Sequence, residues 1–188
     1  MVSLGALAGI AAPASFISAW VTGGAVTPGY SPVQDHISDL AAIGATTRPL
    51  MTAGFLGFSA FAPFFAKHLA ASLDQPALRL SLTAAAAGTL GVAAFPLGGP
   101  FGTGPHGAAA AVSYLAMASN PVLGSRALRR SGNDDRLAGL SLVTGLAAGA
   151  LLTRSLVGEQ QGLFQRLGMT VADSWLIGMA VRELRRDA

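Results

Sequence analysis

Long apolar runs, separated by short polar interruptions, set the pattern of hydrophobic and polar positions along this chain. Most runs are apolar on every side, whereas a helix in a soluble domain keeps one polar face toward water. Each run is close to the ~20 residues that a helix needs to cross the hydrocarbon core of a bilayer. The pattern predicts six transmembrane helices, over residues 3–26, 50–71, 80–98, 106–124, 137–155 and 163–181.

Turn-forming residues separate the predicted spans, as Thr27, Pro28 and Gly29 do after the first one. The chain contains no internal repeat and no linker-like segment. We therefore expect one all-α domain over residues 1–188, an integral membrane bundle of six transmembrane helices.

Composition strengthens the membrane interpretation. Hydrophobic residues make up 52% of the chain and charged residues 11%, and the mean hydropathy is +0.53. The chain contains no cysteine, which excludes disulfides, thiolate metal sites and cysteine nucleophiles. The basic residues behind the net charge of +3 form no continuous stripe, so we expect no nucleic-acid partner.

The basic residues also predict the orientation of the spans, because cytoplasmic loops are enriched in Lys and Arg. The loops after the second and fourth spans and the C-terminal tail hold Lys67, Arg79, Arg126, Arg129, Arg130, Arg136, Arg182, Arg185 and Arg186. The other three loops hold only Arg48, Arg154 and Arg166. We therefore expect a multi-pass protein with both termini in the cytoplasm. The first run lacks the charged start of a secretory signal, so we expect it to be retained.

The loop over residues 27–49 is too long for a plain connection. Ser31, Pro32 and Gln34 have the form of an N-cap, a first-turn proline and a capping-box partner, and Gly44 suits a C-cap. These signals predict an amphipathic interfacial helix of about 12 residues between the first two spans.

One face of that predicted helix carries Asp35, His36 and Asp39. The simplest interpretation is a solvated polar face on a surface helix. The expected topology, however, places these side chains beside other polar residues at the outer ends of spans, namely His106, Arg154, Glu159 and Arg166. We therefore expect a polar cluster on the outer side of the bundle.

Two strings of the sequence suggest a family. The string PGYSPVQDHISDLAAIGA, followed by a proline and a second span rich in Gly and Phe, resembles the domain-of-unknown-function 998 family of small bacterial multi-span membrane proteins. The string PLGGPFGTGPHG, which leads into the fourth span, fits the same family. The resemblance covers nearly the whole chain. It implies a compact bundle of about six helices in a bacterial cell membrane and supplies no activity.

Asp173 lies ten positions into the sixth predicted span, which is roughly 15 Å along the helix axis. An ionised aspartate at that depth costs at least ~2.5 kcal/mol, so the carboxyl group should be protonated, paired or facing a cavity. A structural ion pair with Arg166 or Arg154 and a functional role both remain open. A carboxyl group kept neutral in an apolar site is also suited to general acid catalysis.

Motifs for several reactions are absent from the sequence: there is no P-loop, dinucleotide fingerprint, GxSxG elbow, HExxH pair or aspartate-rich run. A membrane enzyme that uses buried carboxylates on a lipid-like substrate remains, and proton-initiated cyclisation of an isoprenoid chain fits best, without a cofactor or metal. The candidate catalytic residues are Asp35, His36, Asp39, His106 and Asp173. The candidate substrate-binding residues are Tyr114, Arg154, Glu159, Arg166 and Trp175.

Two other functions remain open. His36, Asp39 and His106 could supply three ligands to the metal of a membrane lipid hydrolase. Alternatively, the chain is a non-enzymatic lipid-binding or small-molecule transport protein, because interrupted spans and an aspartate at the membrane midplane also suit transport. In each case the expected partner is a membrane lipid or an isoprenoid small molecule.

Overall fold

The computed structural model describes residues 3–132 and 134–186, and these residues form six α-helices and one short 3₁₀ helix. In chain order they are α1 (Leu4–Val26), η1 (Ile37–Ala41), α2 (Arg48–Ser72), α3 (Pro76–Ala94), α4 (Gly104–Ser131), α5 (Asp135–Arg154) and α6 (Gln161–Arg186). Each of the six predicted spans corresponds to one α-helix, which confirms the all-α class.

Four of these helices, α1, α2, α3 and α5, are long and apolar enough to cross a membrane. This finding indicates a multi-pass membrane protein. The other two are longer, at 28 residues for α4 and 26 for α6, but carry more polar positions. Several polar side chains of α6 point into the bundle, where Gln165, Arg166, Asp173 and Glu183 are all buried.

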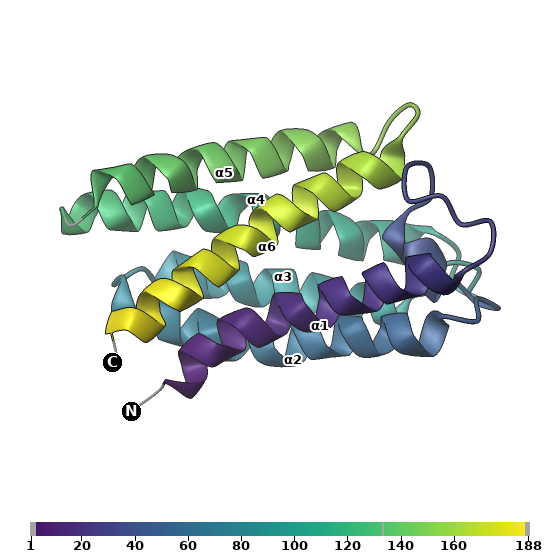
Figure 1. Cartoon of the computed structure of the whole chain (residues 1–188), viewed down its shortest axis with the longest axis horizontal. Helices are drawn as coiled ribbons and strands as arrows, with labels where there is room; N and C mark the ends of the chain where they lie inside the picture. The colour runs from purple at the N-terminus through teal and green to yellow at the C-terminus, as the bar shows by residue number, and fades with distance from the viewer. Residues whose placement is uncertain (1–2, 133, 187–188) are drawn as a thin grey trace.

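The six helices form a closed ring. Each packs against the next one along the chain, and α6 returns to pack against α1 (Figure 1). Glycines allow the close approach that helix packing in lipid requires. A Cβ atom at Gly88 of α3, for example, would lie 2.6 Å from the backbone nitrogen of Ser113 in α4.

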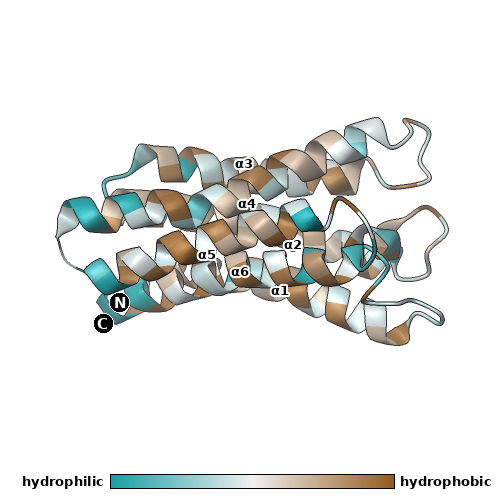
Figure 2. Cartoon of the chain, turned by 90° about the horizontal axis from the view of Figure 1, so that it is seen from above, coloured by the Kyte–Doolittle hydropathy of each residue, from teal (hydrophilic) through white to brown (hydrophobic). Residues whose placement is uncertain are grey.

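The two ends of the bundle differ in character. Both chain termini lie at one end, here named the terminal end, and the three longer connections lie at the opposite, loop end (Figure 1). Figure 2 shows hydrophilic residues gathered at the terminal end. There the buried Glu183 pairs with Arg182, with Arg186 at 3.5 Å and with Nε2 of His68 at 3.7 Å.

The predicted 12-residue interfacial helix is wrong. The helix between α1 and α2 is the five-residue η1, and the residues from Ser31 to Asp35, where the predicted helix begins, form one turn. The physical reason lies in the backbone carbonyls of Pro32, Val33 and Asp35, which a helix would use internally. Arg166 binds two of them, at 2.8 and 2.9 Å, and the N–H group of Leu163 binds that of Val33 at 3.0 Å.

The connection over residues 27–47, which contains η1 and is here named the η1 loop, folds into the loop end of the ring. Ile37 and Leu40 are each 1% exposed and pack in the core together with Phe16 of α1 and Phe55 of α2. The N–H group of Ile43 donates to the carbonyl of Leu97 at 2.8 Å, which joins this loop to the α3–α4 connection. The η1 loop therefore closes the bundle at its loop end.

Candidate functional site

Two adjoining cavities lie beneath the η1 loop. The smaller, about 30 Å³, lies inside the bundle and has room for little more than one water molecule. The larger, about 470 Å³, lies along α4 and α5 at the loop end and is lined mainly by apolar side chains. Five residues line both cavities: Ser38, His106, Ala110, Tyr114 and Gln165.

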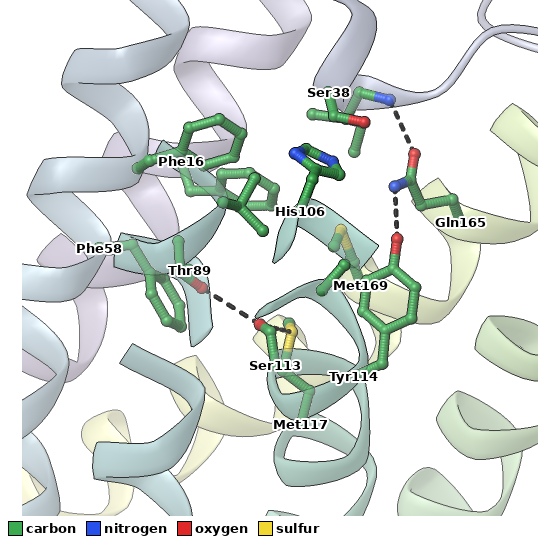
Figure 3. A pocket seen from close by; sticks show the side chains of 14 residues that line it. Phe16, Ser38, Phe58, Thr89, His106, Ser113, Tyr114, Met117, Gln165 and Met169 are labelled. Atoms are coloured by element: carbon green, nitrogen blue, oxygen red, sulfur yellow. Dashed lines mark hydrogen bonds between the residues drawn. The ribbon is translucent and has the colours of Figure 1, made fainter. Parts of the chain in front are cut away.

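The walls of the smaller cavity combine aromatic rings with hydroxyl groups (Figure 3). Phe16 stacks on Phe55 with ring centroids 5.8 Å apart and meets Phe58 edge-on at 6.2 Å. Beside Phe58, the hydroxyl groups of Thr89 and Ser113 lie 3.1 Å apart. These hydroxyls also bond within their own helices, so most of their capacity is already used.

His106 lies in the first turn of α4 and is 8% exposed. Its Nδ1 atom lies 2.8 Å from the carbonyl oxygen of Phe95. Because a carbonyl can only accept, Nδ1 must carry the proton of the neutral imidazole, and Nε2 keeps its lone pair. No residue in the described part of the chain forms a hydrogen bond with Nε2.

Gln165 of α6 connects the η1 loop to Tyr114 of α4. The backbone N–H group of Ile37 donates to its Oε1 atom at 2.7 Å, and its Nε2 atom donates to the Tyr114 hydroxyl at 2.6 Å (Figure 3). The backbone donor fixes which end of the amide is oxygen. The Tyr114 oxygen therefore accepts from Gln165, and its own proton is left to be donated.

The polar cluster expected around Asp35, His36 and Asp39 forms only in part. The Oδ2 atom of Asp35 accepts the N–H group of Ser31 at 2.7 Å, and the Oδ2 atom of Asp39 accepts that of His36 at 2.8 Å. Neither carboxylate lines a cavity, whereas His36 lines the larger one together with His106. The two carboxylates thus hold the loop backbone in shape.

The proposed metal ligands His36, Asp39 and His106 are not grouped. Within residues 3–132 and 134–186, no three His, Cys, Asp or Glu side chains lie close enough to hold a metal ion. The geometry of the described residues therefore gives the metal-dependent hydrolase no ligand set.

Arg166 secures the η1 loop to α6. Besides the carbonyls of Pro32 and Asp35, its guanidinium group binds the Tyr30 hydroxyl, and it lies over the Trp20 ring at 5.5 Å. Burial raises the pKa of Tyr30, and the nearby positive charge of Arg166 opposes that rise. Arg166 thus holds in place the η1 loop, which covers both cavities, and lines neither cavity itself.

Asp173 is fully buried, and neither of its carboxylate oxygens has a hydrogen-bond partner in the described part of the chain. An ion pair with Arg166 or Arg154, one of the two interpretations that the sequence left open, does not form. Seven-residue spacing places Asp173 on the α6 face that meets α1, between the Arg166 contact with Trp20 and the Ala180 contact near Gly9. It lines neither cavity.

The other predicted binding residues lie outside the cavities, with Tyr114 as the exception. Arg154 is exposed, binds the carbonyl of Val157 and lies over the Phe164 ring at 4.7 Å. Glu159 is exposed in the α5–α6 connection. Trp175 is buried and donates from Nε1 to the Ser141 hydroxyl at 2.8 Å, which is a packing role.

The sequence interpretation missed Gln165 and Ser38 and could not select the aromatic wall. An uncharged polar residue inside a predicted span was the available signal for Gln165, because such a group must find partners within the bundle. The chain has nine phenylalanines, and no local pattern distinguishes the three that line the smaller cavity.

Comparison with known protein families gives a match over most of the chain. The profile of a family described as "Protein of unknown function (DUF998)" matches residues 10–182. No curated protein and no solved structure matches the chain.

Proposed function

The chain belongs to the DUF998 family, whose description names no activity, and from that premise we propose that it is a six-span membrane protein that binds a lipid-like small molecule. The proposed site is the pair of adjoining cavities at the loop end. The single observation that carries the proposal is the larger cavity, about 470 Å³ and lined mainly by apolar side chains. Ligand sites in proteins are typically roughly 300–1,000 Å³.

The ring arrangement supports six spans. α4 packs between α3 and α5, and α6 packs between α5 and α1, and all three of these neighbours are candidate spans. Helices that pack side by side along their lengths share the same solvent, so α4 and α6 belong in the bilayer too. The excess of Lys and Arg at the terminal end then favours a cytoplasmic location for both chain termini.

The location of the larger cavity favours entry of the ligand from the lipid. Its walls include Leu115 of α4, which is 71% exposed on the flank of the bundle, and Leu156 beyond α5. No Asp, Glu, Lys or Arg lines either cavity in the described part of the chain. An apolar molecule with a small uncharged head fits these walls better than a charged metabolite does.

Binding can be tested with a long-chain alcohol that carries a photoreactive diazirine. We expect labelling to concentrate in α4 and α5, and Ala110→Phe to reduce it by about tenfold, because Ala110 lines both cavities. Ala108→Phe, at an exposed position of the same helix that lines neither cavity, is the matched control. Labelling spread evenly over the lipid-facing surface, unchanged by Ala110→Phe, would refute the site.

Proton-initiated cyclisation of an isoprenoid chain is the second candidate. The observation that favours it is the wall of Phe16, Phe55 and Phe58, because aromatic faces stabilise positive charge. A proton would add to a carbon–carbon double bond, ring closure would move the cation, and Nε2 of His106 would take a proton from the neighbouring carbon. The net change is an isomerisation, so no co-reactant is needed.

The acid in such a reaction would be Asp173, which sits one helical turn, about 6 Å, beyond the cavity residue Met169. The carboxyl group of Asp173 lines neither cavity, and the smaller cavity, at about 30 Å³, is too small for an isoprenoid chain, so this reaction would require side-chain movements that open the cavity. Binding needs no such movement, and the geometry therefore favours binding over cyclisation.

A further inference from the structure

The hydrogen-bonding capacity of the cavity walls can be worked out group by group. Among the residues that line both cavities, His106 presents an acceptor at Nε2, and Tyr114 presents an O–H donor. Gln165 has little hydrogen-bonding capacity left for a ligand, because its amide oxygen accepts from the N–H group of Ile37 and its nitrogen donates to Tyr114. Ser38 carries a hydroxyl that can act in either sense.

We propose that the ligand carries one uncharged hydroxyl group, which binds between Nε2 of His106 and the phenol of Tyr114, and is therefore a long-chain apolar alcohol. This inference rests on the proposed function and names the class of its ligand. An alcohol donates one hydrogen bond and accepts others, so it can satisfy the imidazole acceptor and the phenol donor at once.

Other head groups match the walls less well. A pure hydrocarbon leaves both the imidazole acceptor and the phenol donor without partners in an apolar site, which carries a desolvation penalty. An ether or a ketone can accept from Tyr114 but cannot donate to Nε2 of His106. A phosphate needs a cation, and Arg166, the buried arginine nearest in sequence to Gln165, is already bonded to the η1 loop.

The chain of the alcohol has a matching apolar surface. The larger cavity continues from His106 and Tyr114 along α4 and α5, past Leu115, Leu152 and Leu156. The polar groups thus lie at one side of an apolar cavity, and this arrangement orients a molecule that has a single polar end.

The test compares four probes with one C15 isoprenoid chain: the alcohol, its methyl ether, the parent hydrocarbon and the monophosphate. Binding is measured on the full chain in lipid nanodiscs. We expect the alcohol to bind about tenfold more tightly than the ether or the hydrocarbon, the factor that one or two buried hydrogen bonds supply.

Two variants assign the preference to its residues. Tyr114→Phe removes the donor, and His106→Asn keeps an amide donor near Phe95 while removing Nε2. Each should weaken alcohol binding about tenfold and leave hydrocarbon binding unchanged. Thr144→Val is the control, because it removes a hydroxyl group that binds the carbonyl of Leu140 within α5 and that lines neither cavity.

The possible failures are distinguishable. Equal binding of alcohol and hydrocarbon, insensitive to both variants, would overturn hydroxyl recognition and leave the lipid-binding function standing. Tightest binding by the monophosphate would overturn the uncharged head group. If none of the four probes binds to protein that is folded by circular dichroism, the proposed function itself fails.

Discussion

Two buried carboxyl groups lie ten residues apart on α6, and their surroundings are opposite. Glu183, 2% exposed, is paired with Arg182, Arg186 and His68 at the terminal end. Asp173, fully buried in the middle of the helix, has no hydrogen-bond partner for either oxygen within the described residues. The same chemical group on the same helix is therefore satisfied in one place and isolated in the other.

The difference separates structural from functional explanations. A buried ion contributes to a fold only where opposite charges and hydrogen bonds surround it, as they surround Glu183. Asp173 costs free energy that no contact in the fold offsets. We therefore interpret Glu183 as part of the scaffold and Asp173 as the residue of α6 whose presence a function has to explain.

Replacement of Asp173 by Asn gives the largest expected effect and tests directly whether Asp173 has a function. If cyclisation is the activity, removing the acid should lower turnover of a linear isoprenoid by at least about 100-fold. The free energy of unfolding should change by less than about 0.5 kcal/mol, because no hydrogen bond is lost. Product analysis in heavy water, where one deuteron is incorporated per turnover, measures the first quantity, and thermal unfolding in detergent measures the second.

Two results would contradict this prediction. A wild-type protein that forms no deuterated product would remove cyclisation as the second candidate. A variant that loses stability as strongly as a Glu183 variant would place Asp173 in the scaffold and erase the contrast between the two carboxyl groups.

Arg166 sharpens the comparison, because it is a buried charge of α6 that is satisfied by carbonyl oxygens and not by a carboxylate. We expect Arg166→Met to destabilise the protein by about 3 kcal/mol, since several charge-assisted hydrogen bonds are lost and the carbonyls are left unpaired. Ligand labelling of the cavities should fall as well. Arg166→Lys should recover only part of either loss, because an ammonium group cannot replace the planar fork.

Hydrogen exchange provides the measurement that distinguishes this role from a general loss of fold. In Arg166→Met, faster exchange should be confined to residues 30–43 and the first turn of α6. Uniformly faster exchange in all helices would show that Arg166 holds the bundle together and not the loop.

Glu183→Gln tests whether Glu183 stabilises the fold. The substitution leaves the positive charges of Arg182 and Arg186 without their anion, but both arginines are partly exposed, so the loss should be about 2 kcal/mol of unfolding free energy. Thermal unfolding in detergent measures it. Binding of the C15 alcohol should stay within about twofold of wild type, because Glu183 lines neither cavity. Weakened alcohol binding in folded protein would connect the terminal end to the site.

The sequence could predict the helices but not the environments of these charges. Runs of about 20 apolar residues predict where the helices lie, and each run corresponds to one of the six α-helices, four of which are candidate spans. Arg166, seven residues before Asp173, looked as suitable a partner as Arg186 does for Glu183. Only the fold shows that Arg166 turns toward carbonyls of the η1 loop, more than 130 residues earlier in the chain.

The same limit explains why the predicted interfacial helix was wrong and why only part of the cavity lining could be predicted. Local capping signals at Ser31 and Gln34 favoured a helix, and contacts with α6, distant in sequence, removed its carbonyl acceptors. His106 could be selected as a polar residue at the start of the fourth predicted span, and Tyr114 as an aromatic residue within that span. Gln165 and Ser38 could not be assigned to a cavity before the helices were placed around one.

Asp35 and Asp39 extend the comparison to carboxylates outside the core, where the smallest effects are expected. Each accepts one backbone N–H group in the η1 loop, at 2.7 and 2.8 Å, as a capping side chain does. Asp35→Asn or Asp39→Asn should therefore cost less than about 1 kcal/mol of unfolding free energy, since an amide oxygen still accepts, and the Ala variants about 1 kcal/mol. Thermal unfolding and alcohol binding are measured together. If either Asn variant abolished binding or turnover while the loop stayed folded, its negative charge would be acting in the site and not in the backbone.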